Sequence, residues 1–306
     1  MELNHNCLYI MMGYNSPEVT EKAVTELKKY TSKKNILLID NGSKNSLEPI
    51  AQKVGVLYFK HIKNLGFSEG YNTWLKKHLD GITQEYICLI NNDVFVNAIM
   101  MTELPKRMKQ WSINKKLAAI QPVLYLDSDL TKVENAGVRY YPTAMAFQNK
   151  DPNRTNDVLL NGACLYLKTL VVKELFAVYG YLLNPLFFFN AEDVELSLRI
   201  KSRGYTLLVD TNLKAQHAQS STVGAKSEFG YKMSVRNLLW TALISRSTTE
   251  LVVTFPFILL GQIVLALLAI KQNMTKSVFF SLLQTQKHIH DIKQYRYQFQ
   301  NNRISN

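Results

Sequence analysis

Acidic and amide side chains follow two apolar stretches in the first hundred residues. Asp40 and Asn41 come directly after the run Asn35–Ile39, and Asn91-Asn92-Asp93 comes directly after Tyr86–Ile90. An aspartate at the end of a buried strand can coordinate a hard cation that also binds two phosphates, because phosphate-bound Mg²⁺ usually needs only one or two protein carboxylates. The alternative is an Asx turn at the point where the chain leaves the strand.

A second acidic group, Glu192-Asp193-Val194-Glu195, follows the phenylalanines Phe187 to Phe189 and opens a helical pattern. A carboxylate beside a hydroxyl group can remove its proton as the oxygen attacks, which is the work of a general base. The phenylalanines would exclude water and shift the pKa of that carboxylate. Alternatively, the acids cap the helix and interact with its dipole, and the phenylalanines belong to the core.

His217 follows a later strand-like stretch. Its imidazole suits a Mn²⁺-like ion better than Mg²⁺, although a structural hydrogen bond is the alternative. The segment Asn64-Leu65-Gly66-Phe67-Ser68-Glu69-Gly70-Tyr71-Asn72 places two glycines before a helix, where the backbone can approach an anion closely. It matches neither a Walker loop nor the dinucleotide fingerprint.

Strand-like and helix-like segments alternate through the first half of the chain, which predicts an α/β fold with a mostly parallel sheet. Ligands of such sheets bind beyond the carboxyl ends of the strands, where the polar groups at Asp40 and Asp93 fall. We expect strands at Leu8–Met12, Asn35–Ile39, Gly55–Phe59, Tyr86–Ile90, Ala118–Leu124 and Thr206–Val209, and helices at Glu18–Tyr30, Leu47–Lys53, Gly70–His78, Thr169–Tyr179 and Val194–Ser202.

The bulk composition fits a globular protein with an anionic partner. The chain has 306 residues and a formal net charge of +12, and from Lys226 to the end it carries ten Lys or Arg against three Asp or Glu. This excess lies beside the most apolar stretch, which favours an anionic membrane surface over nucleic acid. The cysteines, Cys7, Cys88 and Cys164, lack metal-ligand spacing, so we expect buried free thiols.

The last quarter of the chain has a different character. Leu251–Ile270 is long enough to span a membrane, but Pro256 and Gln262 interrupt it, and a second apolar patch follows at Ser277–Leu283. Three arrangements are open: a re-entrant or in-plane helical pair, a true span, and a buried or oligomer-forming hairpin that would make a homo-oligomer. Because of this difference in character, we divide the chain into a domain at 1–240 and a membrane-associating region at 241–306. The N-terminus lacks the basic region of a secretory signal.

The order of the motifs is more specific than any one of them. Asp40-Asn41-Gly42-Ser43, the segment from Asn64 to Asn72, Asn91-Asn92-Asp93, Asn161-Gly162-Ala163-Cys164, Glu192-Asp193 with Arg199, and His217 follow one another, with Tyr231 and Arg236-Asn237-Leu238 after them. Over roughly residues 7–240 this series resembles the family-2 glycosyltransferases. The likeness is greatest to their bacterial rhamnosyl- and galactofuranosyl-transferase-like branch.

The resemblance implies a nucleotide-diphospho-sugar transferase fold of the A type and an inverting mechanism. The donor would be a dTDP- or UDP-sugar, and the acceptor a lipid-linked or cell-surface glycan at the cytoplasmic face of the cell membrane. By this resemblance Asp193 is the catalytic base with Glu192 beside it, Asp93 and His217 hold Mg²⁺ or Mn²⁺, and Asp40 holds the nucleoside. The other residues expected at the donor are Asn41, Asn64, Gly66, Phe67, Gly70, Asn72, Asn91, Asn92, Gly162 and Arg199.

The sequence departs from the family pattern at three places. Asn91 stands where the metal-binding motif has its first aspartate, Leu182-Leu183-Asn184 replaces a Phe-Asp-Glu, and Lys168-Thr169 replaces paired arginines. Asn91 favours the alternative of a non-catalytic membrane-bound partner in a glycan-assembly complex. A nucleic-acid binder is not expected, because no reader motif is present.

Overall fold

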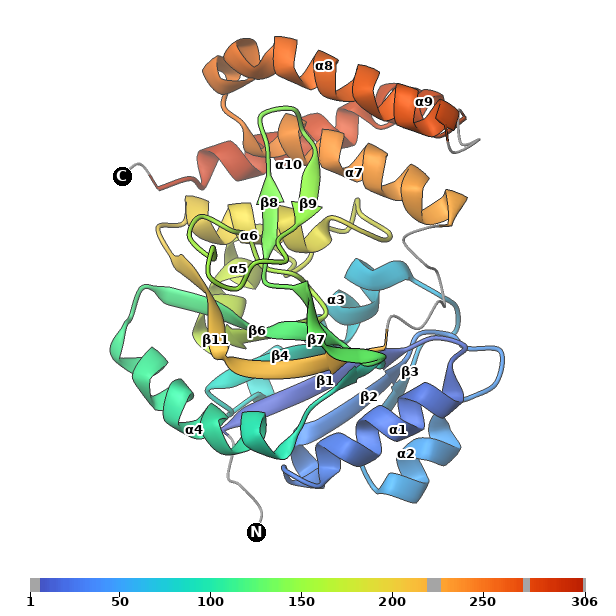
Figure 1. The fold of residues 1–306 in the computed structure, drawn as a ribbon, viewed down its shortest axis with the longest axis vertical. Coiled ribbons are helices and arrows are strands. Elements are labelled where there is room, and N and C mark those ends of the chain that lie inside the picture. The colour runs from blue at the N-terminus through green and yellow to red at the C-terminus, as the bar shows by residue number, and fades with distance from the viewer. Residues whose placement is uncertain (1–5, 219–226, 272–275, 305–306) are drawn as a thin grey trace.

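One mixed β-sheet forms the centre of the computed structural model, which describes residues 6–218, 227–271 and 276–304 (Figure 1). Its strands are β1 (Cys7–Gly13), β2 (Ile36–Asp40), β3 (Leu57–Lys60), β4 (Tyr86–Asn91), β5 (Val94–Phe95), β6 (Leu117–Leu126), β7 (Asp129–Asn135), β10 (Cys164–Lys168) and β11 (Thr206–His217). Within these ranges the strand order is β3-β2-β1-β4-β10-β6-β11-β5, with β7 paired to β6. β1 to β4 are parallel, whereas β10 runs antiparallel to both of its neighbours.

The sheet is covered on both faces because its strands alternate their side chains between two cores. In β1, Cys7, Tyr9 and Met11 face one core, and Leu8 and Ile10 face the other. The first core is completed by α1 (Pro17–Lys28), α2 (Glu48–Val54) and α4 (Ala98–Ile113). The second is completed by α3 (Gly66–His78), α5 (Thr169–Tyr179) and α6 (Glu192–Ser202).

The expected α/β fold is confirmed, and the main differences lie in the middle of the chain. Helix α4 was not expected, although its N-terminus carries a clear signal: the Asn97 side chain accepts a hydrogen bond from the backbone N–H of Met100. The expected short strand Thr206–Val209 continues as β11 to His217, past an irregularity between Asp210 and Lys214. The three cysteines are buried and free, as expected.

Four helices form a layer above the second core: α7 (Glu228–Ser245), α8 (Thr248–Lys271), α9 (Lys276–Lys287) and α10 (Ile289–Asn301) (Figure 1). Helix α7 packs on α6 below and on α9 and α10 within the layer. The predicted boundary between residues 240 and 241 falls inside α7, where Trp240 and Thr241 are both buried. The apolar stretch Leu251–Ile270 lies within α8, which continues through Pro256.

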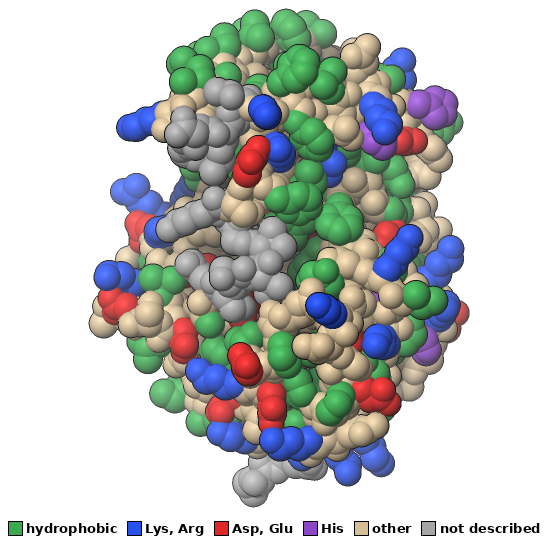
Figure 2. Space-filling model, turned by 90° about the vertical axis from the view of Figure 1, so that its right-hand side faces the viewer, with side chains coloured by type: hydrophobic (Ala, Val, Ile, Leu, Met, Phe, Trp, Pro, Cys, Tyr) green, Lys and Arg blue, Asp and Glu red, His purple; other side chains and the backbone are tan. Residues whose placement is uncertain are grey.

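Helix α8 presents one side to the protein and the other to the outside. Its buried residues, Ile258, Gly261, Leu265 and Ala269, recur at helical spacing and form one face. Within the described ranges, α8 is the one helix long and apolar enough to cross a membrane. Figure 2 shows hydrophobic side chains gathered over this top layer. The outer face of α8 and α9 carries exposed Val252, Val253, Phe255, Phe257, Leu259, Leu260, Ile263, Leu267, Leu268, Ile270, Phe279, Leu282 and Leu283.

A two-stranded hairpin connects the sheet with α8. β8 (Val138–Tyr140) and β9 (Ala146–Gln148) rise from the end of β7 toward the top layer (Figure 1). At the hairpin tip, the carbonyl oxygen of Thr143 approaches Gly261 so closely that a Cβ there would lie 2.2 Å away. Glycine is therefore required at this contact, which ties α8 to the body of the protein.

Candidate active site

Asp93 and His217 meet at the end of the sheet. Strands β5 and β11 pair antiparallel with His217 opposite Val94, and the backbone N–H of Ala218 donates to the carbonyl of Asp93. This pairing sets the His217 Nε2 atom 3.2 Å from an Oδ1 of Asp93, with both side chains largely buried. Two residues that are 124 positions apart are thus brought together, as the sequence predicted.

Glu134 completes this group and was not predicted. Its Oε2 atom lies 2.7 Å from Nδ1 of His217. Glu134 projects this way because β7 has an irregularity there: Leu124 of β6 pairs with Asn135 and Tyr125 with Val133, so Glu134 is an extra residue. Burial alone would lower the pKa of His217, but the hydrogen bonds to Asp93 and Glu134 outweigh it and raise the pKa to about 10.

The group fits a divalent cation that is shared with a phosphorylated ligand. No cluster of three or more His, Cys, Asp or Glu arranged around one cation position occurs in the part of the chain that the structure describes. A carboxylate and an imidazole nevertheless suffice where diphosphate oxygens and water supply the remaining ligands. Because Glu134 engages Nδ1 of His217, Nε2 is the ring nitrogen that would face a cation held beside Asp93.

Asp193 lies at the N-terminus of α6 and accepts two backbone hydrogen bonds. The N–H of Gly162 donates to its Oδ2 over 2.9 Å, and the N–H of Val194 donates to its Oδ1 over 2.8 Å. Burial raises the pKa of Asp193, and the same two hydrogen bonds oppose that rise because they stabilise the charged form. The carboxylate is held in one orientation and is made more basic than an exposed aspartate.

The segment around Gly162 links Asp193 to the end of β4, two residues before Asp93. The backbone N–H of Asn91, the last residue of β4, donates to the carbonyl of Ala163 over 2.8 Å. Gly162 precedes Ala163, and a Cβ on Gly162 would lie 3.3 Å from the Cβ of Asp193. Asp93, His217 and Asp193 therefore converge on one end of the sheet.

Glu192 is buried directly behind Asp193. Its Oε2 atom has no hydrogen-bond partner within the described residues. Burial first, and then the charge of Asp193, raise the pKa of Glu192 to about 8. Burial and the neighbouring charge of Asp193 thus favour the protonated form of Glu192.

The glycine segment folds against Asn41 and the phenylalanine loop. Asn41 donates from its side chain to the Asn64 side chain and to the carbonyl of Gly66. Gly66 has a φ of 79°, and a Cβ there would lie 2.4 Å from the carbonyl oxygen of Phe188. Gly70 packs on Met12 of β1, so the start of α3 lies directly on the sheet.

Asp40 lies below this surface and shapes the loop that follows β2. It is completely buried, and its two oxygens accept hydrogen bonds from the N–H groups of Ser43 and Leu47 and from the Tyr58 hydroxyl. Asp40 would therefore affect a bound nucleoside only through the loop that it holds in place. Asn92 donates from its side chain to the hydroxyl of Thr20 over 2.7 Å.

Two residues expected at the donor are structural instead. Arg199 is completely buried, pairs with Glu195 at 3.0 Å and donates to backbone carbonyls at 181 and 182, so it faces no ligand. Asn72 is buried too, and its side-chain amide forms hydrogen bonds with the backbone of Leu182 and Leu183. The predicted donor contacts of both side chains are therefore wrong.

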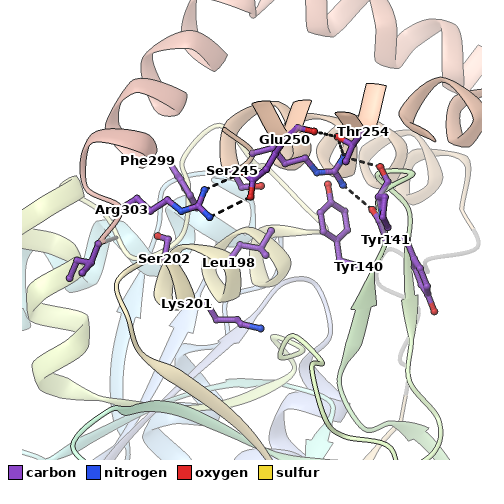
Figure 3. Close-up of a pocket in the computed structure, with 13 residues that line it drawn as sticks. Tyr140, Tyr141, Leu198, Lys201, Ser202, Ser245, Glu250, Thr254, Phe299 and Arg303 are labelled. Carbon is purple, nitrogen blue, oxygen red and sulfur yellow. Dashed lines mark hydrogen bonds and ion pairs between the residues drawn. The ribbon is translucent and has the colours of Figure 1, made fainter. Parts of the chain in front are cut away.

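A cavity of about 660 Å³ lies elsewhere, beyond the far end of α6 (Figure 3). Figure 3 shows Arg303 paired with Glu250. Arg246, which also lines the cavity, donates to the carbonyls of residues 141 and 142 at the hairpin tip. None of its lining residues is a predicted site residue.

Solved glycosyltransferase structures share this fold. The mannosyltransferase PcManGT from Pyrobaculum calidifontis, in complex with GDP-Man and Mn²⁺, aligns with a TM-score of 0.54 and 10% identity over 92% of this chain and 75% of its own. GalNAc-T7 with UDP, GalNAc and Mn²⁺ aligns with a TM-score of 0.55 and 13% identity over 78% of this chain and 47% of its own. Glucosyl-3-phosphoglycerate synthase from Mycobacterium tuberculosis, with Mg²⁺ and UDP, aligns with a TM-score of 0.51 and 12% identity over 78% of this chain and 79% of its own. The A-type fold is confirmed.

Residues 9–155 match the family model described as glycosyl transferase family 2. The chain carries a family-2 glycosyltransferase domain. The matched segment contains Asp40, the glycine segment and Asp93, whereas Asp193 and His217 lie beyond it, so their assignment depends on the convergence described above. Curated protein sequences gave no significant match to this glycosyltransferase.

Proposed function

We propose that the enzyme is an inverting glycosyltransferase of the rhamnosyl- and galactofuranosyl-transferase-like branch. It transfers a sugar from a dTDP- or UDP-linked donor to a lipid-linked or cell-surface glycan. One observation carries the proposal: an Asp93–His217 pair and a backbone-anchored Asp193, from distant parts of the sequence, lie at the same end of the sheet. Ligands of α/β sheets bind at such strand ends.

Asp193 acts as the general base. It takes the proton of an acceptor hydroxyl while that oxygen forms a bond to the anomeric carbon of the donor sugar. The bond from this carbon to the diphosphate breaks on the opposite face, its electron pair leaves with the nucleoside diphosphate, and the configuration inverts. The hydrogen bonds from Gly162 and Val194 fix the orientation of the carboxylate during this step.

Asp93 and His217 would hold the metal, and Glu134 would keep the imidazole in place. A bound Mg²⁺ or Mn²⁺ neutralises the charge that develops on the diphosphate leaving group. The Mn²⁺ or Mg²⁺ present with a nucleotide in three structures of the same fold supports this assignment. The imidazole makes Mn²⁺ the better fit of the two.

The α8–α9 surface attaches the enzyme to the cytoplasmic face of the cell membrane. One face of α8 packs on α7, α9 and the β8–β9 hairpin, and the opposite face is apolar and exposed. A helix with this division lies in the plane of the membrane, because crossing the membrane would break the contact between Gly261 and Thr143. The basic residues of this region suit anionic headgroups.

The second candidate is a non-catalytic membrane-bound partner in a glycan-assembly complex. Asn91 favours it, since the first position of the metal motif is an amide here. The grouping of Asp93, His217 and Glu134 argues against it, because a chain without catalysis has no need of a buried metal site.

A thermal-unfolding screen with nucleotide-sugars tests the proposal. A donor that binds the native state raises the unfolding temperature, and it should do so more strongly with Mn²⁺ than without it. The stabilising donor should then be hydrolysed slowly in the presence of Mn²⁺. Stabilisation without any hydrolysis or transfer would favour the non-catalytic alternative, and no stabilisation by any nucleotide-sugar would contradict both.

A further inference from the structure

Three phenylalanines form an aromatic cluster beside the proposed base. The ring centroids of Phe188 and Phe229 are 6.3 Å apart, and those of Phe189 and Phe229 are 6.4 Å apart. Phe188 is 39% exposed and Phe229 is 42% exposed. Large aromatic side chains gathered at a surface next to a reaction site mark a binding surface.

The loop that carries Phe188 and Phe189 is held in an energetically unfavourable backbone conformation. Asn190 and Ala191 both have positive φ angles, 68° and 64°, which non-glycine residues rarely adopt. The buried Asn237 of α7 donates to the carbonyls of Phe189 and Asn190, and the Asn190 side chain donates back to α7. Such strain persists where the surroundings enforce it, and it often accompanies function. The position of the cluster is thus fixed by several independent contacts.

The cluster reaches the base through Phe67. The carbonyl of Phe188 accepts a hydrogen bond from the N–H of Phe67 over 2.7 Å. The Phe67 ring in turn would lie 3.8 Å from a Cβ on Gly162, whose N–H holds Asp193. The cluster is therefore connected through Phe67 to the segment that holds Asp193.

The other end of the cluster leads to the apolar outer face of α8 and α9. Phe229 is followed one turn later on α7 by Lys232, whose ammonium lies 6.0 Å above the ring of Phe280 on α9. Phe279 and Leu283 of the same helix are exposed. Figure 2 shows hydrophobic side chains continuing from the top layer to the middle of this side of the molecule.

We propose that Phe188, Phe189 and Phe229 bind the isoprenoid or acyl tail of a lipid-linked acceptor and guide its glycan to Asp193. The proposal rests on the proposed function and assigns its acceptor class. A hydrocarbon tail matches aromatic rings that offer no hydrogen bonds, and the continuity with the α8–α9 face supplies its route from the membrane. Sugar rings also stack on aromatic side chains, so the choice of a hydrocarbon tail rests on the link between this cluster and the exposed apolar face of α8 and α9.

Photocrosslinking tests this assignment with the full chain on vesicles of phosphatidylglycerol that contain polyprenyl phosphate. Phe229→p-benzoylphenylalanine should crosslink to the polyprenyl chain several-fold more, relative to phospholipid, than Phe255→p-benzoylphenylalanine on the outer face of α8. Phe147→p-benzoylphenylalanine, on the exposed strand β9, should crosslink to neither lipid. Equal lipid ratios at 229 and 255, or no lipid adduct at 229, would overturn the proposal.

Two measurements on the same preparations keep the outcomes separate. An unchanged unfolding temperature shows that each variant is folded, and Mn²⁺-dependent donor hydrolysis shows that the reaction site is intact. Normal hydrolysis without polyprenyl selectivity at 229 removes the acceptor assignment alone. Absence of hydrolysis from the unsubstituted chain would instead contradict the proposed function.

Discussion

The Nδ1 atom of His217 lies 2.7 Å from Oε2 of Glu134, while its Nε2 atom lies 3.2 Å from Asp93. The imidazole is thereby held between two carboxylates, one for the proposed cation and one behind the ring. A carboxylate in the second position fixes the tautomer and orientation of a metal-binding histidine and increases its basicity. Because Glu134 is placed by an irregularity in β7, its effect depends on the fold and not on local sequence.

Glu134→Ala should lower the affinity for Mn²⁺ by roughly 10- to 100-fold, the usual effect of removing such a partner. Glu134→Gln should restore part of it, because the amide oxygen still accepts from Nδ1. Titration of free Mn²⁺ by electron paramagnetic resonance in the presence of UDP measures this directly. Glu103→Gln, on the exposed surface of α4, serves as the control. Equal affinity in Glu134→Ala and the control would contradict the role of Glu134.

Asp193→Asn should reduce transfer by roughly 10²- to 10⁴-fold, since the amide cannot take a proton. The amide oxygen can still accept from the N–H of Gly162, whereas the amide nitrogen cannot accept from the N–H of Val194, so one of the two backbone hydrogen bonds is kept. Stabilisation by UDP with Mn²⁺ should therefore match that of the unsubstituted enzyme. Initial rates with donor and acceptor, beside unfolding temperatures with UDP, separate the two effects. Wild-type turnover in Asp193→Asn would refute the assignment of the base.

Gly162→Ala tests how closely the base is positioned. The added Cβ would lie 3.3 Å from the Cβ of Asp193, tighter than most real contacts, so the carboxylate must shift by a few tenths of an ångström. We expect a lower kcat with little change in KM for the donor. Gly81→Ala is the matched control, because a Cβ there meets nothing within 4 Å. Equal kcat values in the two variants would show that the contact does not matter.

Most of the fold could be predicted because β1, β2 and β4 follow the simple alternation of apolar segments. The pairing of Asp93 with His217 was expected from the order of motifs and not from any local pattern. Glu134 could not be found this way, because the irregularity in β7 alone directs its side chain. Arg199 and Asn72 were misassigned since burial depends on non-local packing: the backbone at 181–183 closes over both.

The pKa of Glu192 makes stability depend on pH. Its folded pKa of about 8 exceeds the ordinary value of 4.5, because the side chain is buried beside Asp193. Between these values the folded state keeps a proton that the unfolded state releases, so stability falls as pH rises through this window. The slope is at most about 1.4 kcal/mol per pH unit. Glu192→Gln should flatten this part of the curve, as measured by urea midpoints, and identical slopes in both proteins would contradict the buried, protonated state.

We expect the exposed outer face of α8 to determine whether the enzyme binds to membranes. Phe257 and Leu260 are 50% and 53% exposed, so replacing both with serine removes little from the core. If this face enters the membrane, each loss weakens binding by about 1.5–3 kcal/mol, and together they should reduce vesicle binding by at least about 100-fold. Flotation with phosphatidylglycerol vesicles measures this, with Leu130→Ser and Phe147→Ser as the control pair.

An in-plane helix and a spanning helix differ in extraction. High salt should leave the unsubstituted enzyme on the membrane, since apolar contacts do not weaken with ionic strength, whereas alkaline carbonate should release it. Resistance to carbonate would instead mean that α8 crosses the bilayer and that its contact with Thr143 at Gly261 is broken there. Release by salt alone would mean that the basic residues, and not the apolar face, attach the enzyme to the membrane.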